Sequence, residues 1–342
     1  MPFLGVTTST WLRYPQCIRS LGILWGSLTL ALITVPELTA RDPDSSDREL
    51  LQRVANDGHL RIGMYLGFEG LSYRERGKLV GLEVEVAELI THVIAKELTV
   101  PVEPQIVNQE WSQIIKVLRD KKYDVVISAV IPSPLYESYG IRYSSSYLDS
   151  GPTICCQEVD GKPRAGLTEN VACLKGKSIV VINDPAVRSA LRSQGIYVEA
   201  DENATDLERC FPKSETLRVM GATGPKDLVP VSSIIQLDDM PKIYELIGSG
   251  EVDAGVIDLG IIWSVSENSK RWAKKIYAFS EPIAPYIYCA VTRKEDEQLG
   301  KAIENAVQTA IQSQEYAQIL KKWHGPKVFH WGLSAEDFLQ SR

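Results

Sequence analysis

The stretch Asp124-Val-Val-Ile-Ser-Ala-Val130 is a nearly unbroken apolar run. Such a run, without alternation of apolar and polar residues, is typical of a strand buried on both faces inside a parallel sheet. Working outward from it, residues 112–118 have a helical pattern, and residues 60–64 and 102–107 read as short strands. Apolar residues at helical spacing fill 82–94 between those strands. Strands that alternate with helices in this way predict an α/β lobe.

The second half of the chain repeats the plan. Residues 178–182 read as a strand, and Pro185 is well placed to open a helix that runs to residue 194. A helix over 241–247 then leads through Gly248-Ser-Gly250 into a strand over 252–257. One long amphipathic helix is expected near the C-terminus. The sequence therefore predicts a second α/β lobe.

Composition and the N-terminus set the class of protein. A net charge of -7 and a pI near 5.3 argue against nucleic acid as a partner, because phosphate binding needs clustered Lys and Arg. Two arginines precede an uncharged, mostly apolar stretch over 20–36, which is the pattern of a secretory signal. We expect a signal peptide over 1–40 with cleavage near Ala40, followed by a linker over 41–56. An uncleaved membrane anchor stays open as the alternative.

The cysteines and histidines give no metal pattern. The spacings of the cysteines do not match the CxxC type, and His59, His92, His324 and His330 are scattered along the chain. We therefore expect no metal and no cofactor. Five cysteines follow residue 40, and this odd number in an oxidising compartment predicts at least one thiol without an intramolecular partner.

Five stretches, taken in order, resemble the bacterial periplasmic solute-binding proteins of family 3, which serve polar amino-acid ABC transporters. The resemblance covers residues 57–325, and the ending Lys322-Trp-His-Gly325 is similar to the closing KWFG of that family. The five stretches are Gly58-His-Leu-Arg-Ile-Gly63, Gly77-Lys-Leu-Val-Gly-Leu-Glu-Val-Glu85, Trp111-Ser-Gln-Ile-Ile with Tyr123-Asp-Val-Val, Leu174-Lys-Gly-Lys, and Gly250-Glu-Val-Asp-Ala254 with Asp258.

The resemblance implies a two-lobed periplasmic binding protein fold of type II, in which each lobe is a mainly parallel sheet flanked by helices. Lobe 1 would comprise 57–150 and 287–325, lobe 2 would be the inserted 151–286, and 326–342 would be a C-terminal tail. Two hinge segments would cross between the lobes, near 148–155 and 281–289. A small ligand would lie between the lobes, where open α/β sheets bind ligands beyond the ends of their strands. The implied protein is a periplasmic monomer that works with an ABC permease.

The resemblance also assigns ligand-binding roles. Phe68 and Trp111 stand where the family places aromatic residues on opposite sides of the ligand, although both residues are also suited to the core. Asp258 matches the carboxylate that binds the ligand's ammonium group in the family, and its alternative role is to cap the following helix. The family's serine-rich stretch reads Ser128-Ala-Val-Ile-Pro-Ser133-Pro-Leu-Tyr136 here. We take Ser128 and Ser133 as candidate ligand contacts.

Two departures from the family concern the charge of the site. Tyr136 occupies the position of the arginine that grips the ligand's α-carboxylate, and Asp184-Pro185 replaces the usual Gly-Thr. Tyr136 and Asp184 are thus candidate site residues of altered polarity. We expect an amine, an amino-acid-like compound or a neutral polar solute that faces Asp258 and lies against Trp111. Arg188 is a candidate replacement cation, with a surface position as the alternative.

Two other functions fit the same resemblance. A sensor or accessory protein would keep the fold but present its state to a partner other than a permease. A dehydratase-like enzyme is less well supported, because the arginine that such carboxylate chemistry needs is missing. We expect Cys173 to pair with Cys210 within lobe 2. The two crossing segments that the family implies would run side by side in the hinge, which suggests that Cys289 pairs with Cys155 or Cys156, although the sequence does not fix the pairing.

Overall fold

A computed structural model describes residues 43–198, 216, 227–324 and 331–340 of the chain. The predicted signal peptide lies outside these residues. Within the described part of the chain, no helix is long and apolar enough to cross a membrane.

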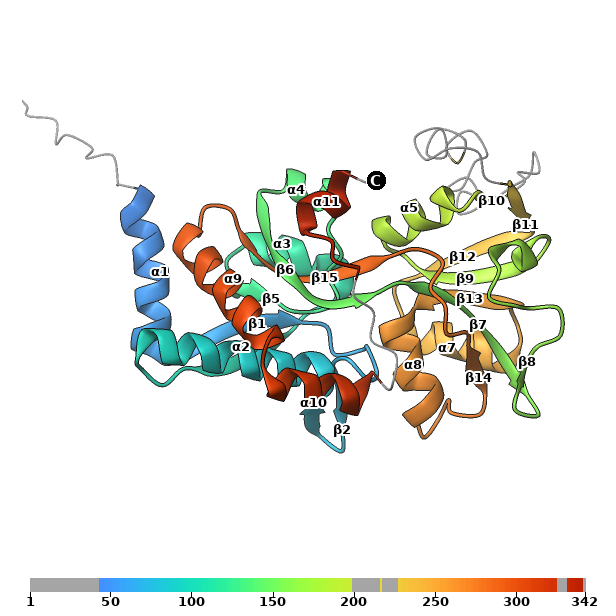
Figure 1. Cartoon of the computed structure of the whole chain (residues 1–342), viewed down its shortest axis with the longest axis horizontal. Coiled ribbons are helices and arrows are strands. Elements are labelled where there is room, and N and C mark those ends of the chain that lie inside the picture. The colour runs from blue at the N-terminus through green and yellow to red at the C-terminus, as the bar shows by residue number, and fades with distance from the viewer. Residues whose placement is uncertain (1–42, 199–215, 217–226, 325–330, 341–342) are drawn as a thin grey trace, which may run out of the picture. The chain divides into compact units, whose positions relative to one another are not determined.

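The first lobe is built on a five-stranded sheet (Figure 1). Its strands, in spatial order, are β4 (Glu103–Asn108), β1 (His59–Met64), β5 (Val125–Val126), β15 (Tyr286–Arg293) and β6 (Ile141–Ser150). Strand β1 pairs in parallel with β4 and β5, whereas β15 pairs antiparallel with β5 and β6. The predicted strand after Asp124 is therefore central in the sheet, and every residue of 123–131 is buried as the apolar run requires.

Helices cover this sheet, and two of them differ from the prediction. The segment 41–56 was expected to be a linker, but α1 begins at Pro43 and buries Val54 completely. The single long C-terminal helix is two helices, because the hydroxyl of Ser313 accepts a hydrogen bond from Tyr316 N and starts a new one. The other elements of this lobe are β2 (Tyr73–Glu75), β3 (Lys78–Val80), α2 (Leu82–Leu98), η1 (Trp111–Gln113), α3 (Ile114–Arg119), α4 (Pro134–Ser138), α9 (Glu297–Ile311), α10 (Gln314–Trp323) and α11 (Ala335–Gln340).

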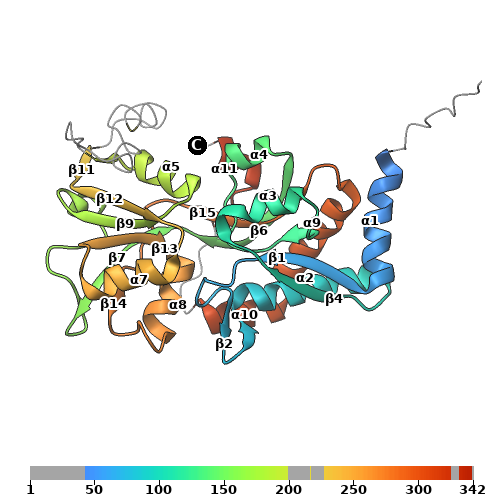
Figure 2. The ribbon, with the colours of Figure 1, turned by 180° about the vertical axis from the view of Figure 1, so that it is seen from behind.

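The second lobe contains a sheet in the order β12, β9, β13, β7, β14, with β8 paired to β7 (Figure 2). Strands β12, β9 and β13 are parallel, and β7 is antiparallel to β13 and β14. The bounds are β7 (Pro152–Val159), β8 (Lys162–Pro163), η2 (Val171–Leu174), β9 (Ser178–Ile182), α5 (Pro185–Ser193), β10 (Ile196–Val198), β11 (Val229–Val231), β12 (Ser233–Leu237), α7 (Met240–Ser249), β13 (Ala254–Asp258), α8 (Leu259–Asn268) and β14 (Ile276–Ala278).

The chain passes between the two sheets twice, and the two crossings touch each other. The first crossing lies at Gly151, between β6 and β7, and the second lies over 279–285, between β14 and β15. Ile283 N donates to Pro152 O at 2.8 Å, so the crossings are hydrogen-bonded. A Cβ on Gly151 would lie 2.2 Å from Ala284 O, which shows that only glycine allows this approach. The pair of segments has the geometry of a hinge.

The C-terminal tail returns to the first of these crossings. Trp331 N donates to an Asp149 carboxylate oxygen, and the Trp331 indole N–H donates to Ser150 O, both at 2.7 Å. The following helix α11 packs on β6 and buries Phe338. The tail is therefore an integral part of the first lobe in its described residues.

The cysteine pairing was predicted incorrectly. Cys155, Cys156 and Cys289 are buried free thiols, and Cys173 is also free. Cys155 and Cys156 lie on β7 inside the second sheet, and Cys289 lies on β15 opposite Ser146 in the first sheet, so these thiols belong to different sheets. Cys210, the other predicted partner, lies outside the described residues.

Candidate functional site

A cavity of about 870 Å³ lies between the two lobes. Its walls come from η1, α3 and α4 of the first lobe and from the start of α5 in the second lobe. The side chains that line it are mainly aromatic, polar and basic. They belong to Trp111, Ser112, Gln113, Ile115, Lys116, Arg119, Leu135, Tyr136, Ser138, Tyr139, Gly140, Asn183, Pro185 and Arg188.

The apolar wall of this cavity is unusually open to solvent. Leu135 is 45% exposed and Tyr139 is 47% exposed, and both belong to α4 or its C-terminal end. Among the described residues, only Val159 is a further large hydrophobic residue with comparable exposure. Apolar side chains gathered in a cleft and left exposed are typical of a ligand-binding surface.

The charged side chains in the lining are all basic. Arg119 Nη1 lies 2.9 Å from an oxygen of Glu295, so its charge is partly balanced at the rim. Arg188 Nη1 donates to Asn183 Oδ1 at 2.7 Å and to Gln236 Oε1 at 3.4 Å, both of which are neutral. No carboxylate among the described residues forms an ion pair with Lys116 or Arg188. The cavity therefore presents positive charge.

Tyr136 and Asp184 meet across the cleft. Asp184 is buried and caps α5, accepting from Ala186 N at 2.7 Å and from Val187 N at 3.3 Å. The Tyr136 hydroxyl lies near enough to the same carboxylate for the two groups to influence each other's pKa. Burial raises the pKa of Asp184, whereas these hydrogen bonds and the nearby Arg188 charge lower it. Burial and the Asp184 charge raise the pKa of Tyr136, so this hydroxyl stays a neutral donor.

The two predicted aromatic residues touch each other. Phe68 and Trp111 form an edge-to-face pair with ring centroids 5.4 Å apart, and Tyr65 packs on the other side of Phe68 at 4.9 Å. Phe68 is only 1% exposed and does not line the cavity, whereas Trp111 does. In this conformation only Trp111 of these rings contributes to the cavity wall, and its contact with Phe68 leaves no room for a ligand between the two rings.

The two predicted serines have backbone partners. The Ser128 hydroxyl is fully buried and accepts from Tyr65 N at 3.0 Å, which fixes the loop after β1. The Ser133 hydroxyl caps α4 by accepting from Leu135 N at 3.3 Å. Both residues therefore position the wall of the cavity in this conformation, and neither lines it.

Asp258 belongs to a separate buried polar cluster near the hinge. Its carboxylate caps α8 by accepting from Gly260 N at 2.9 Å, and it also accepts from the Ser150 hydroxyl. Burial raises the pKa of Asp258 to about 6, although Ser150, the Tyr288 side chain and Gly260 N lower it. Asp258 does not line the cavity that contains Trp111. Here it fills the helix-capping role that was the alternative in the sequence.

Glu83, which the sequence did not single out as a site residue, lies in the same buried cluster. It is fully buried on α2 and accepts hydrogen bonds from Ala129 N, the Tyr147 hydroxyl and the Ser72 hydroxyl. Burial raises the pKa of Glu83 to about 7, and the Asp258 charge contributes in the same direction. The charges of the two carboxylates thus act on each other.

Sequence reasoning missed Lys116, Arg119 and Asn183. A signal for the first two was present, since Lys116 and Arg119 are three residues apart and therefore lie on one helical face shortly after Trp111. Ser-Pro at 133–134 and Asp-Pro at 184–185 were also readable as helix starts, because Ser or Asp before Pro is the usual N-cap pattern.

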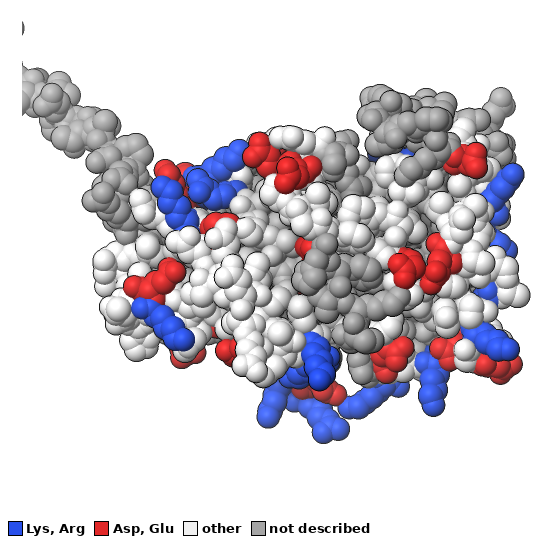
Figure 3. Space-filling model, viewed as in Figure 1, with Lys and Arg blue, Asp and Glu red and all other residues white. Residues whose placement is uncertain are grey.

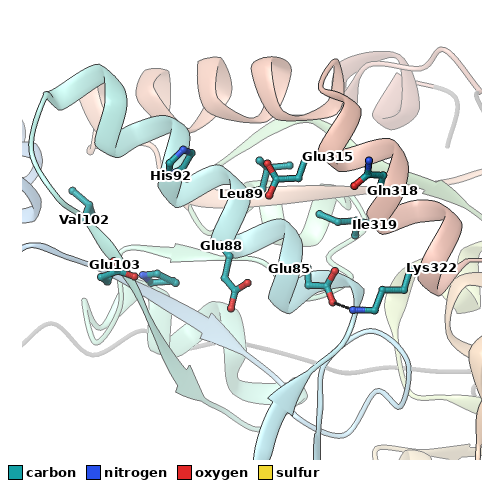
Figure 4. Close-up of a pocket in the computed structure, with 11 residues that line it drawn as sticks. Glu85, Glu88, Leu89, His92, Val102, Glu103, Glu315, Gln318, Ile319 and Lys322 are labelled. Carbon is teal, nitrogen blue, oxygen red and sulfur yellow. Dashed lines mark hydrogen bonds and ion pairs between the residues drawn. The ribbon is translucent and has the colours of Figure 1, made fainter.

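A second hollow lies on the outer side of the first lobe, between α2, α10 and the start of β4 (Figure 4). Four glutamates line it, and the Glu85 carboxylate is paired with Lys322 and accepts from Trp323 Nε1 at 3.0 Å. Among the described residues, no group of acidic, histidine or cysteine side chains is arranged to hold a metal ion. None of the predicted site residues lines this hollow.

The two lobes, the paired crossings and the cavity between them define the class of two-lobed solute-binding proteins. The sequence pattern of the bacterial extracellular solute-binding proteins, family 3, matches residues 60–326, and the chain belongs to this family.

The relatives found by comparison are distant. The ABC transporter glutamine-binding protein GlnH of Bacillus subtilis (strain 168) is 21% identical over 133 residues, which is 38% of this chain and 47% of that protein. The match therefore spans about half the length of that relative.

Among solved structures, the ancestral amino acid-binding protein AncCDT-1, a precursor of cyclohexadienyl dehydratase, has 17% identity and a TM-score of 0.58, covering 80% of this chain and 99% of that one. An ancestral arginine-binding protein bound to arginine has 22% identity and a TM-score of 0.55, covering 78% and 99%. At these identities the likeness shows the fold.

Proposed function

We propose that this protein is an extracytoplasmic solute-binding protein that captures a small polar ligand between its lobes for an ABC importer. The cavity carries the proposal, because residues of both lobes line it and three of the predicted site residues form or adjoin its walls. Rotation of the lobes about the paired crossings would enclose a ligand there and exclude water, which strengthens polar contacts. The function is binding without catalysis.

A thermal-shift screen of the exported protein against amino acids, amines, polyols and small acids tests this function. A ligand that binds only the folded state raises its melting temperature. Trp111→Ala should weaken binding of any hit at least about tenfold, because the indole forms the wall of the cavity. The matched control is Trp263→Ala, which removes a tryptophan on α8 that does not line the cavity. Equal loss in both variants, or no loss in either, would count against the site.

The sequence and the relatives each suggest ligands for this screen. From the sequence we expect an amine, an amino-acid-like compound or a neutral polar solute facing Asp258. The relatives named for glutamine and arginine make amino acids an obvious part of the screen. Asp258→Asn tests the sequence-based expectation directly, since a cationic group facing Asp258 would lose its ion partner and at least tenfold in affinity, about 1.4 kcal/mol.

The partner and the location of the protein complete the proposal. Export through the N-terminal signal, with a mature end near Arg41, is tested by N-terminal sequencing of exported protein. Recovery of intact Met1 in a membrane fraction would show an anchor. A sensor role is distinguished from import by measuring uptake of the ligand in cells lacking the protein, because only a transport component changes uptake.

A further inference from the structure

We infer that the cavity between the lobes binds the anionic group of a small organic acid, which Lys116 and Arg188 hold from opposite sides. This inference rests on the proposed function and assigns the chemical class of the ligand. It differs from the expectation drawn from the sequence, in which the site favours a cation or a neutral solute facing Asp258.

The positions of the charged side chains relative to the cavity favour an anionic ligand over a cationic one. Both carboxylates that were expected to make the cleft negative accept hydrogen bonds within the protein. Asp184 accepts from two backbone N–H groups, and Oδ1 of Asp258 accepts from Ser150 and Gly260 in a different cluster, while Asp258 Oδ2 is buried without a hydrogen-bond partner among the described residues. Neither carboxylate lines the cavity, whereas three basic side chains do. An ammonium group in the cavity would face three basic side chains and an anion would meet opposite charge, although the Asp184 carboxylate near Arg188 offsets part of this positive charge.

The two proposed binding side chains come from different lobes. Lys116 is an exposed residue on α3, and Arg188 is a half-buried residue on α5. The Arg188 guanidinium donates to the neutral oxygens of Asn183 and Gln236, and it forms no salt bridge with a carboxylate of the described residues, although the charge of nearby Asp184 acts on it. Two like charges on opposite walls resist approach of the lobes, and an anion between them reverses the sign of that interaction. Anion binding would therefore favour the closed protein.

The apolar wall indicates the rest of the ligand. Leu135 and Tyr139 offer exposed apolar surface beside the basic side chains, and Trp111, which is 5% exposed, lines the same cavity. A free inorganic anion would use none of this surface, and a simple polyol would leave the charges without partners. An organic acid with an aromatic or aliphatic body matches both walls at once.

The experiment compares probes that share a skeleton and differ in charge. Isothermal titration calorimetry on the whole chain would use 3-phenylpropionate, 3-phenylpropanamide and 3-phenylpropylamine, and in parallel glutarate, glutaramide and cadaverine. In the series that fits, we expect the acid to bind at least about tenfold more tightly than the amide, about 1.4 kcal/mol, and the amine to bind most weakly.

Variants then locate the anionic group. Arg188→Gln and Lys116→Gln should each weaken binding of the acid about tenfold and leave binding of the amide within about twofold. Lys122→Gln is the matched control, because this exposed lysine follows α3 but does not line the cavity. Arg188→Lys should restore part of the lost affinity by keeping the charge without the planar fork.

The outcomes separate the two levels of the proposal. If an amide or an amine binds as tightly as its acid, or if neither glutamine variant weakens acid binding, the anion site is wrong and the solute-binding function stands. If no compound of either series binds and the thermal-shift screen gives no hit, both the anion site and the proposed function are wrong.

Discussion

Replacing Glu83 with glutamine should make the protein more stable at neutral pH and leave its stability near pH 4.5 almost unchanged. Glu83 is fully buried, and burial raises its pKa from 4.5 to about 7, so the folded protein holds a proton that the unfolded chain releases. Between these two pH values the folded state binds more protons than the unfolded state. The free energy of unfolding of the wild type therefore falls as pH rises through this window.

The size of the effect follows from the pKa difference. A pKa change of one unit corresponds to about 1.4 kcal/mol, so a rise from 4.5 to about 7 costs about 3 kcal/mol once both states are ionised. Glutamine keeps a carbonyl oxygen for Ala129 N and the Tyr147 hydroxyl, and its NH₂ group can donate to the Ser72 hydroxyl oxygen. The neutral amide therefore keeps the contacts without the cost of burying a charge.

Urea unfolding of the wild type and the variant at a series of pH values measures the difference directly. The stability advantage of Glu83→Gln should grow from near zero at pH 4.5 to about 3 kcal/mol above pH 7 and then stay level. Glu97→Gln, an exposed change on the same helix, is the control and should shift stability by less than about 0.5 kcal/mol. An advantage that does not depend on pH, or a less stable variant at neutral pH, would refute this reasoning.

Three further changes test the framework of the site. Asp124→Asn should lower the free energy of unfolding in urea by about 3–5 kcal/mol, because it removes the charge of a fully buried carboxylate that pairs with two arginines. Although burial raises the pKa of Asp124, the arginines hold it below 3.8, so wild-type stability should fall as pH drops below about 4 while that of the variant changes less. Gly151→Ala places a methyl group against Ala284 O and should cost about 1–3 kcal/mol, measured by calorimetry, and an unchanged melting temperature would contradict the tight crossing. Trp331→Phe removes the donor to Ser150 O and should lower the free energy of unfolding by about 1 kcal/mol, whereas equal stability would mean that the tail contributes nothing there.

The hydrophobic pattern of the sequence predicted the positions of most strands and helices, but it did not predict the residues at which they end. The buried run after Asp124 was predicted as a strand, yet the regular ladder is limited to β5. The cause is at Ala129, whose φ is +48° and whose N–H donates to the Glu83 carboxylate instead of a neighbouring strand. A side chain distant in sequence thus ends the strand pairing, and the local hydrophobic pattern does not predict this. The helix α1 was missed because its first residues are polar and suit a linker as well.

The candidate site was harder to predict, because the resemblance to a family shows which residue occupies each site position but not which groups that residue contacts in the fold. Trp111 and Tyr136 line the cavity as expected from their places in the family pattern. Asp258 and Asp184 were expected to offer their charges to a ligand, but in the fold each carboxylate caps a helix, and Oδ1 of Asp258 also accepts from the Ser150 hydroxyl. Lys116 was overlooked because an exposed lysine on a helix is ordinary in sequence. Its importance depends on the second lobe, which faces it from far along the chain.

The tail that returns to Ser150 also matters for how the protein behaves in solution. Strand β6 is the outer strand of the first sheet, and an uncovered outer strand offers unpaired N–H and C=O groups to other chains. Helix α11 lies on this strand and buries Phe338 against the lobe. The family match ends at residue 326, before the helix begins. A chain shortened to that boundary would lose the helix that packs on β6 and β15, and we expect it to aggregate at concentrations where the full chain stays dispersed, as light scattering would measure.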